Sequence, residues 1–316
     1  MRENGLEGAD VPMTREETKE KILRLKEEKN AVILAHYYVA DELQEIADFT
    51  GDSFYLSQRA AESAASVIVF CGVRFMAESA KILSPQKTVY LPCPTADCPM
   101  AHMASAERVR AMREEVDDLA VVCYINSTAE LKACSDVCVT SSNAVKIVRA
   151  LKEENIYFIP DGNLGRFVEK QCPDKNFYFS DGFCCVHAHL RADDVNKARA
   201  AHPEAKLMVH PECREEVVAL ADFVGSTKAM IEYAQKSADK SFIVGTERGI
   251  LFELTRRCPE KSFFLLTDDM TCRDMKKLDL SQVLAALEGK IAPVELTKEE
   301  IQAGRGCLEK MLELGK

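Results

Sequence analysis

The sequence contains no hydrophobic run close to the roughly 18 to 20 residues of a membrane span, and its amino terminus lacks the apolar core of a signal peptide. We therefore expect a cytoplasmic protein with no membrane partner. The sequence also lacks an excess of basic residues, because its formal net charge is -10. A general nucleic-acid binder needs a basic face, so no nucleic-acid partner is expected. This charge does not exclude a small anionic substrate that is held by local hydrogen-bond donors.

Cysteine, in contrast, is abundant. The chain has 13 cysteines, an odd number that would be hazardous in an oxidising compartment. Reduced thiols in the cytosol either pack as small apolar groups or bind metal. Metal binding is therefore favoured over disulfide formation.

A motif with proline, lysine and a β-prone aromatic run occurs three times, at Pro85–Leu91, Pro173–Phe179 and Pro259–Leu265. The three prolines are 88 and 86 residues apart, and this period indicates three structural repeats. Each motif predicts a turn at the proline that is followed directly by a buried strand. A cysteine follows each proline by 11 to 13 residues, in the loop beyond that strand: Cys98, Cys184 and Cys272. Three equivalent loops can point toward one centre.

Polar residues also stand where a second apolar run ends in each unit. These runs, Ala31–Tyr38, Ala120–Asn126 and Lys206–Glu212, keep the same spacing as the prolines. Open parallel sheets bind ligands beyond the carboxyl ends of their strands. We therefore expect the three cysteines to share one cavity with the polar residues at these ends: His36, Tyr38, Tyr124, Asn126, His210 and Glu212.

Strands are predicted to alternate with helices along the chain, which indicates an α/β fold. We expect three pseudo-threefold-related βαβ repeats, each a small parallel sheet with flanking helices, and an active site at their common centre. In the first unit the predicted strands are 31–36, 67–70 and 88–91. The expected parts are a disordered tail at 1–13, repeats at 14–103, 104–190 and 191–279, and carboxyl-terminal helices at 280–316 that cover an exposed edge.

Three hydroxyl residues, Ser53, Ser141 and Thr227, each lie 17 residues after His36, Tyr124 and His210, respectively. They are predicted at helix starts, where they could serve as helix caps or as contacts for substrate anions. The two interpretations are compatible, because capping and anion binding use the same N–H groups.

Simpler interpretations apply to single residues. A cysteine taken alone is usually a core or surface thiol, and this is our expectation for the ten cysteines outside the repeat. Cys93 and Cys185 are close rivals, because each lies within five residues of a repeat cysteine. A lone histidine at a strand end is also usually structural, and only the repeat favours His36 and His210 as site residues. Glu247 and Arg248 are expected to form a surface pair.

The number of cysteines bears on the kind of metal. A structural zinc site uses four protein ligands, and catalytic zinc rarely has three widely spaced thiolates. A 4Fe-4S cluster that is held by three thiolates leaves one iron without a protein ligand, free to act as a Lewis acid. Electron transfer normally uses four ligands, so three cysteines favour dehydration chemistry.

Many ordered motifs show that the chain resembles the quinolinate synthase family over roughly residues 16 to 290. They include Ala35-His-Tyr-Tyr38, Cys98-Pro-Met-Ala101, Gly182-Phe-Cys184-Cys-Val-His187, His210-Pro-Glu-Cys213 and Cys272-Arg-Asp-Met-Lys276. The resemblance implies condensation of iminoaspartate with dihydroxyacetone phosphate to quinolinate, phosphate and water, in de novo NAD biosynthesis. It also implies a 4Fe-4S cluster as Lewis acid and allows a transient contact with L-aspartate oxidase.

Carried over to this sequence, the resemblance implies three groups of site residues. Cys98, Cys184 and Cys272 would hold the cluster. The implied catalytic residues are His36, Tyr38, Tyr124, His210 and Glu212. The implied substrate-binding residues are His36, Ser53, Tyr124, Asn126, Ser141, His187, His210, Glu212 and Thr227.

Two other functions stay open at this stage. A different 4Fe-4S hydro-lyase would use the same three-cysteine site on another substrate. A non-catalytic metal-binding module would need neither the histidines at the strand ends nor the hydroxyl residues.

Overall fold

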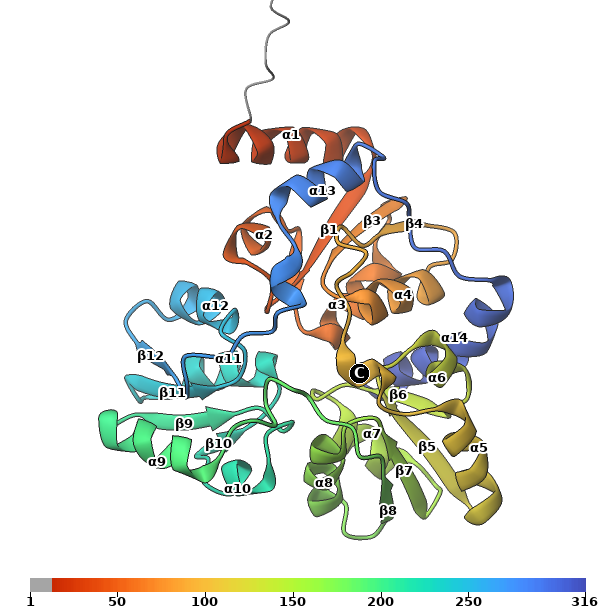
Figure 1. Cartoon of the computed structure of the whole chain (residues 1–316), viewed down its shortest axis with the longest axis vertical. Coiled ribbons are helices and arrows are strands. Elements are labelled where there is room, and N and C mark those ends of the chain that lie inside the picture. The colour runs from red at the N-terminus through yellow and green to blue at the C-terminus, as the bar shows by residue number, and fades with distance from the viewer. Residues whose placement is uncertain (1–12) are drawn as a thin grey trace, which may run out of the picture.

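The computed structural model describes residues 13–316 and shows three α/β lobes around a common centre (Figure 1). The predicted tail at 1–13 lies outside the described residues, apart from Met13. Each lobe contains one four-stranded sheet, and the strand orders are β2-β1-β3-β4, β6-β5-β7-β8 and β10-β9-β11-β12. All strand pairs are parallel. The prediction of three related βαβ repeats is confirmed.

The elements follow the same sequence in each lobe. The first contains α1 (Arg15–Glu28), β1 (Ala31–His36), α2 (Asp41–Ile46), β2 (Phe49–Gly51), α3 (Ser53–Glu62), β3 (Val67–Cys71), α4 (Arg74–Leu83) and β4 (Thr88–Tyr90). The short 3-10 helix η1 (Pro99–His102) follows this lobe, and the second lobe contains α5 (Ala106–Glu115), β5 (Leu119–Tyr124), α6 (Ala129–Ala133), β6 (Val137–Val139), α7 (Ala144–Ala150), β7 (Asn155–Ile159), α8 (Gly162–Gln171) and β8 (Asn176–Phe179).

The third lobe contains α9 (Ala192–Ala201), β9 (Lys206–Val209), α10 (Glu215–Val218), β10 (Phe223–Val224), α11 (Thr227–Lys236), β11 (Ser241–Gly245), α12 (Ile250–Arg257) and β12 (Ser262–Leu265). After it come η2 (Met275–Lys277), α13 (Leu280–Leu287) and α14 (Lys298–Leu314). The expectation of three strands for the first unit is wrong by one. The additional strand, β2, has three residues, and its counterpart β10 has only two, too few for an apolar pattern to reveal.

The lysine of the repeated motif stabilises the end of a helix in every lobe. Lys87 Nζ donates to the backbone oxygens of Ala60 (2.9 Å) and Ser63 (2.5 Å), at the end of α3. Lys175 and Lys261 make the equivalent pairs of bonds at the carboxyl-terminal ends of α7 and α11. A cation at this place satisfies carbonyl groups that have no partner within the helix and complements the helix dipole.

An aspartate is repeated in the same manner. Asp48, Asp136 and Asp222 accept a hydrogen bond from the backbone of β1, β5 and β9, respectively, at 2.7 to 2.8 Å. Each of these carboxylates also pairs with a basic side chain, from Lys26, Arg113 or Arg199. The loop that leads to the short edge strand is thereby fixed to the central strand of each sheet.

The apolar core is not divided equally among the lobes. One buried cluster joins the first two sheets with α13 and α14, whereas the third lobe packs around two separate clusters. Helix α14 packs against α4, α6, α7 and the edge strand β6, in agreement with the expectation that the tail covers an edge. Among residues 13–316, no helix has the length and apolar character needed to cross a membrane.

Candidate active site

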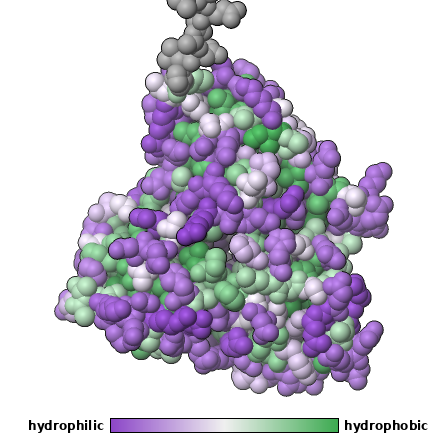
Figure 2. Space-filling view, viewed as in Figure 1, coloured by the Kyte–Doolittle hydropathy of each residue, from purple (hydrophilic) through white to green (hydrophobic). Residues whose placement is uncertain are grey.

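A cavity of about 540 Å³ lies at the meeting point of the three lobes. Figure 2 shows a mainly hydrophilic surface, with more apolar residues near the centre of this face. The cavity lies beyond the carboxyl ends of the strands, as expected for parallel sheets. Every site residue that the sequence predicted lines it: His36, Tyr38, Ser53, Cys98, Tyr124, Asn126, Ser141, Cys184, His187, His210, Glu212, Thr227 and Cys272.

The three repeat cysteines reach the cavity from the loops after β4, β8 and β12. Burial raises the pKa of each thiol, to about 11 for Cys272. Backbone N–H groups two or three residues further along the chain act in the opposite direction on every sulfur. Each loop thus offers a sulfur with local donors, and such donors also stabilise thiolates that bind iron.

The rival cysteines lie differently. Cys93 is buried and does not line the cavity, and its thiol is 3.4 Å from the Thr95 hydroxyl. Cys185 lines the cavity but is exposed to solvent.

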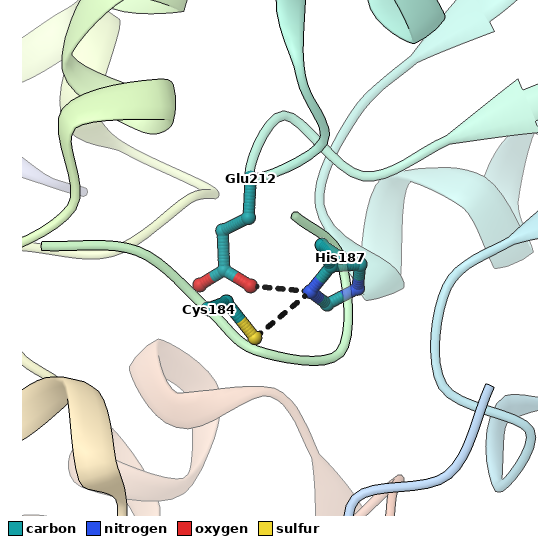
Figure 3. Close-up of side chains that lie close together, drawn as sticks. All are labelled: Cys184, His187 and Glu212. Carbon is teal, nitrogen blue, oxygen red and sulfur yellow. Dashed lines mark hydrogen bonds and ion pairs between the residues drawn. The ribbon is translucent and has the colours of Figure 1, made fainter. Parts of the chain in front are cut away.

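Figure 3 shows a compact group at the cavity wall that combines Cys184, His187 and Glu212. The Nδ1 atom of His187 lies 2.7 Å from Glu212 Oε2 and 3.2 Å from Cys184 Sγ. Sulfur, nitrogen and carboxylate ligand atoms of these residues all lie within 4.8 Å of one another, close enough to hold a metal ion. The wall of the cavity therefore has metal-binding capacity.

The Glu212 carboxylate is fully enclosed, and burial alone would raise its pKa. The neighbouring His210 and His187 outweigh burial and hold the pKa of Glu212 well below its usual value. Because an ionised carboxylate only accepts hydrogen bonds, the His187 Nδ1–H group is the donor to Glu212. Burial lowers the pKa of His187 and favours its neutral ring. Nε2 of this neutral ring is then an acceptor.

Tyr38 is held by two threonines from the third lobe. Its hydroxyl lies 2.8 Å from Thr227 Oγ1 and 2.7 Å from Thr246 Oγ1. Burial, with a further contribution from Glu212, raises the pKa of Tyr38 well above its usual value, so the phenol is protonated.

His36 lies beside Tyr38, with the two rings 4.6 Å apart in an edge-on arrangement. Its Nδ1 accepts the backbone N–H of Tyr38, which places the proton of a neutral ring on Nε2. Burial lowers the pKa of His36 to about 3. The residue is therefore a neutral donor.

His210 and Asn126 complete the polar wall. His210 Nε2 lies 3.1 Å from Ser141 Oγ, and the His210 ring stacks on His187 with centroids 4.7 Å apart. The Asn126 Oδ1 atom is buried and has no hydrogen-bond partner among the described residues. A buried polar atom in this state at a cavity is free to bind a ligand.

The hydroxyl residues are not the helix caps. Asp52 caps α3 and Ser226 caps α11, and Ser53 and Thr227 follow them as the first helical residues. Helix α7 begins at Ala144, so Ser141 precedes the Asn143 cap position. The capping interpretation is therefore wrong for all three, because their neighbours already occupy the cap positions.

Sequence reasoning missed several buried groups: Glu247, which lines the cavity, and Asp161 and Thr246, which do not. Glu247 is fully buried, not part of a surface pair, because Lys276 and the backbone N–H groups of Gly249 and Cys272 satisfy its carboxylate. Asp161, also fully buried, caps α8. Thr246 joins Tyr38 to His187. All three residues follow the third strand of a unit. This common position in the repeat was the feature of the sequence that could have identified them as site residues.

Fold and site together define a three-lobed α/β protein with a central, metal-competent cavity lined by thiol, imidazole and carboxylate groups. A sequence model described as quinolinate synthetase A protein (NadA) matches residues 20–313. The chain is 53% identical to a quinolinate synthase of Caldicellulosiruptor bescii, over 96% of this chain and 100% of that protein. It is 50% identical to one from Geobacter metallireducens (93% and 96%) and 47% identical to one from Fusobacterium nucleatum (94% and 99%). The chain belongs to the quinolinate synthetase A family.

Proposed function

We propose that the protein is a quinolinate synthase, which condenses iminoaspartate with dihydroxyacetone phosphate to quinolinate, phosphate and water. The observation that carries this proposal is the central cavity, to which each repeat contributes one cysteine from the equivalent loop. Family membership over nearly the whole chain supports the same activity.

Cys98, Cys184 and Cys272 would hold a 4Fe-4S cluster. The donor set suits this group, since three thiols line one cavity and each has local N–H donors to its sulfur. When bound, such a cluster supplies a Lewis-acid iron that has no protein ligand and can polarise a substrate oxygen.

Three residues are suited to proton transfer. The ionised Glu212 carboxylate can take a proton from substrate, and the protonated Tyr38 phenol can give one. The neutral His36 ring can donate from Nε2 to a substrate oxygen. Tyr124, which is buried against Glu212, would orient the substrate between these groups.

Binding of anionic substrates requires donors inside a protein of net negative charge. Ser53, Ser141 and Thr227 all line the cavity and are not needed as helix caps, so their hydroxyls are available for carboxylate or phosphate oxygens. The unpaired Asn126 Oδ1 would accept from a substrate N–H or O–H group. His187 and His210 complete the polar wall around the substrates.

The partners implied by this function are its two small-molecule substrates. A transient contact with L-aspartate oxidase would deliver iminoaspartate. We place the protein in the cytoplasm, where its free thiols stay reduced.

An anaerobic assay with the iron-loaded protein, iminoaspartate and dihydroxyacetone phosphate tests the proposal. Quinolinate and phosphate are expected in equal amounts. Absence of quinolinate from a protein that carries a complete cluster would assign it to another dehydration reaction.

A further inference from the structure

Two free thiols from distant parts of the chain meet in the core that the first two lobes share. Cys138 is the central residue of β6, and Cys307 lies on α14, 169 positions further along the chain. Both side chains are buried in the same apolar cluster, and their Sγ atoms are 2.9 Å apart. Two thiols at this separation need little rearrangement to form a disulfide, whose S–S bond is about 2.05 Å long.

A third thiol, Cys123, lies against this pair. It is the register partner of Cys138 in the neighbouring strand β5, and its Sγ is 3.0 Å from Ser127 Oγ. Burial raises the pKa of the Cys123 thiol, but the bond with Cys138 and the charge of the buried Lys132 outweigh burial and lower this pKa to about 7. Burial raises the pKa of Cys138 well above its usual value. Cys138 therefore needs a proton acceptor to become a thiolate, the form that attacks a disulfide, and Cys123 is in place to accept that proton.

Helix α14 is held by few buried side chains. Of its 17 residues, four are buried: Gly304, Cys307, Leu308 and Met311. An element with few buried contacts opens locally at a lower free energy than the whole protein unfolds. Cys307 thus reaches solvent when α14 lifts from β6, while the three sheets stay folded.

We propose that Cys138 and Cys307 form a modification site, at which a small-molecule disulfide oxidises the two thiols and links α14 covalently to β6. Cys307, as a thiolate, attacks the S–S bond of the oxidant and releases one small thiol. Cys138 gives its proton to Cys123 and attacks the Cys307 sulfur of the mixed disulfide. The second small thiolate leaves and takes the proton from Cys123. Two protein S–H bonds and the S–S bond of the oxidant are broken, and one protein S–S bond and two small-molecule S–H bonds are formed.

The link would fix the joint between two lobes. Helix α14 packs against α4 of the first lobe and against α6, α7 and β6 of the second. A covalent bond across so long a loop restricts the unfolded chain, and it also prevents α14 from lifting. Neither Cys138 nor Cys307 lines the central cavity, so this inference does not rest on the proposed function.

Peptide mapping tests the site in protein that is purified and handled without air. Oxidised glutathione is the probe, because this small disulfide requires no dioxygen. After alkylation of the remaining thiols, tryptic digestion without reductant should yield peptides 133–146 and 306–310 joined to each other. Fragmentation should place the bond at Cys138 and not at Cys134, which lies in the same peptide. The linked protein should melt about 5 to 10 °C above the reduced protein, and dithiothreitol should reverse this gain.

Cys307→Ala should lose both the linked peptides and the gain in Tm. Cys172→Ala is the matched control, because Cys172 is also buried in the second lobe and its Sγ contacts only a backbone oxygen, at 4.0 Å. It should keep both. Each variant is compared with its own reduced form, so that the effect of the substitution on folding cancels. If Cys307→Ala does not fold, the map and the melting curve of the wild type decide.

Three results would overturn the proposal. Cys138 and Cys307 could both remain free thiols in wild-type protein that carries glutathione on the exposed Cys185. The bond of Cys138 could run to Cys123 instead of Cys307. The linked protein could melt at the same temperature as the reduced protein, which would show that the bond does not fix α14.

Discussion

At the scale of single residues, the site depends on a carboxylate that stays ionised although it is buried. Glu212 is only 3% exposed, and isolation of a charge at this depth costs several kcal/mol unless partners compensate it. His187 and His210 supply that compensation, and the backbone N–H of Glu212 itself is directed to His210 Nδ1. The Glu212 carboxylate is therefore ionised at neutral pH and faces the cavity as a hydrogen-bond acceptor for a bound substrate.

Glu212→Gln removes the base and keeps the shape of the side chain. We expect kcat to fall by about 10² to 10⁴, with substrate binding retained, because the amide cannot accept a proton at neutral pH. Steady-state kinetics of quinolinate formation measure this change. Glu216→Gln, an exposed glutamate on the same segment, is the control and should behave as wild type. A Glu212→Gln enzyme with kcat within a few-fold of wild type would exclude the carboxylate from proton transfer.

At the scale of elements, the repeated lysine shows why the motif recurs in the sequence. Lys87 is 6% exposed, and its ammonium group binds two carbonyl oxygens at the carboxyl-terminal end of α3. Burial lowers the pKa of Lys87, a cost that these bonds offset. Lys175 and Lys261 make the same bonds, so the third helix of each lobe ends in the same way.

Lys87→Met tests this structural role. We expect a loss of about 2 to 3 kcal/mol in the free energy of unfolding, because two charge-assisted hydrogen bonds disappear and their carbonyls lose a partner. Urea unfolding of the loaded protein measures it. Lys29→Met, at an exposed lysine of the same lobe, should change stability by less than about 0.5 kcal/mol. Equal stabilities of the two variants would contradict the helix-end role of Lys87.

Elements with a long pattern or a strong cap could be predicted from the sequence. The capping box at Thr14 opens α1, and α13 has the predicted bounds, Leu280–Leu287. Parallel sheets bind ligands beyond the carboxyl ends of their strands, and equivalent repeats have the same geometry. These two facts were enough to place His36, His210 and the repeat cysteines at one cavity. Strand β10 was not predicted, because two residues are too few to show the alternating apolar pattern of a strand.

The part of the site that escaped prediction consists of contacts between lobes. Glu247 was expected at the surface, but its partner Lys276 also donates to the backbone oxygen of Tyr38 in the first lobe. Thr246 likewise contacts Tyr38 and His187, which lie in two other segments of the chain. Such contacts depend on how the three units pack, which the local sequence does not encode.

At the scale of the whole molecule, the cavity exists only because three similar units face one another. Each unit by itself is a small sheet that contributes one repeat cysteine and the polar residues at its strand ends. Helix α14 and the shared core fix the first two lobes together, and Tyr38 connects the first lobe to the third through Thr227 and Thr246. The proposed chemistry therefore belongs to the assembly of lobes and to no single lobe.

The most direct test of this account is replacement of each repeat cysteine by serine, followed by anaerobic absorbance and quinolinate assays. Cys98→Ser, Cys184→Ser and Cys272→Ser should each abolish the broad absorbance at roughly 400 nm expected for a thiolate-bound iron-sulfur centre, together with activity. Cys93→Ser and Cys185→Ser, the neighbouring thiols, should keep both. A complete cluster in Cys184→Ser, with loss of the cluster in Cys185→Ser, would contradict the assignment of one equivalent cysteine to each repeat.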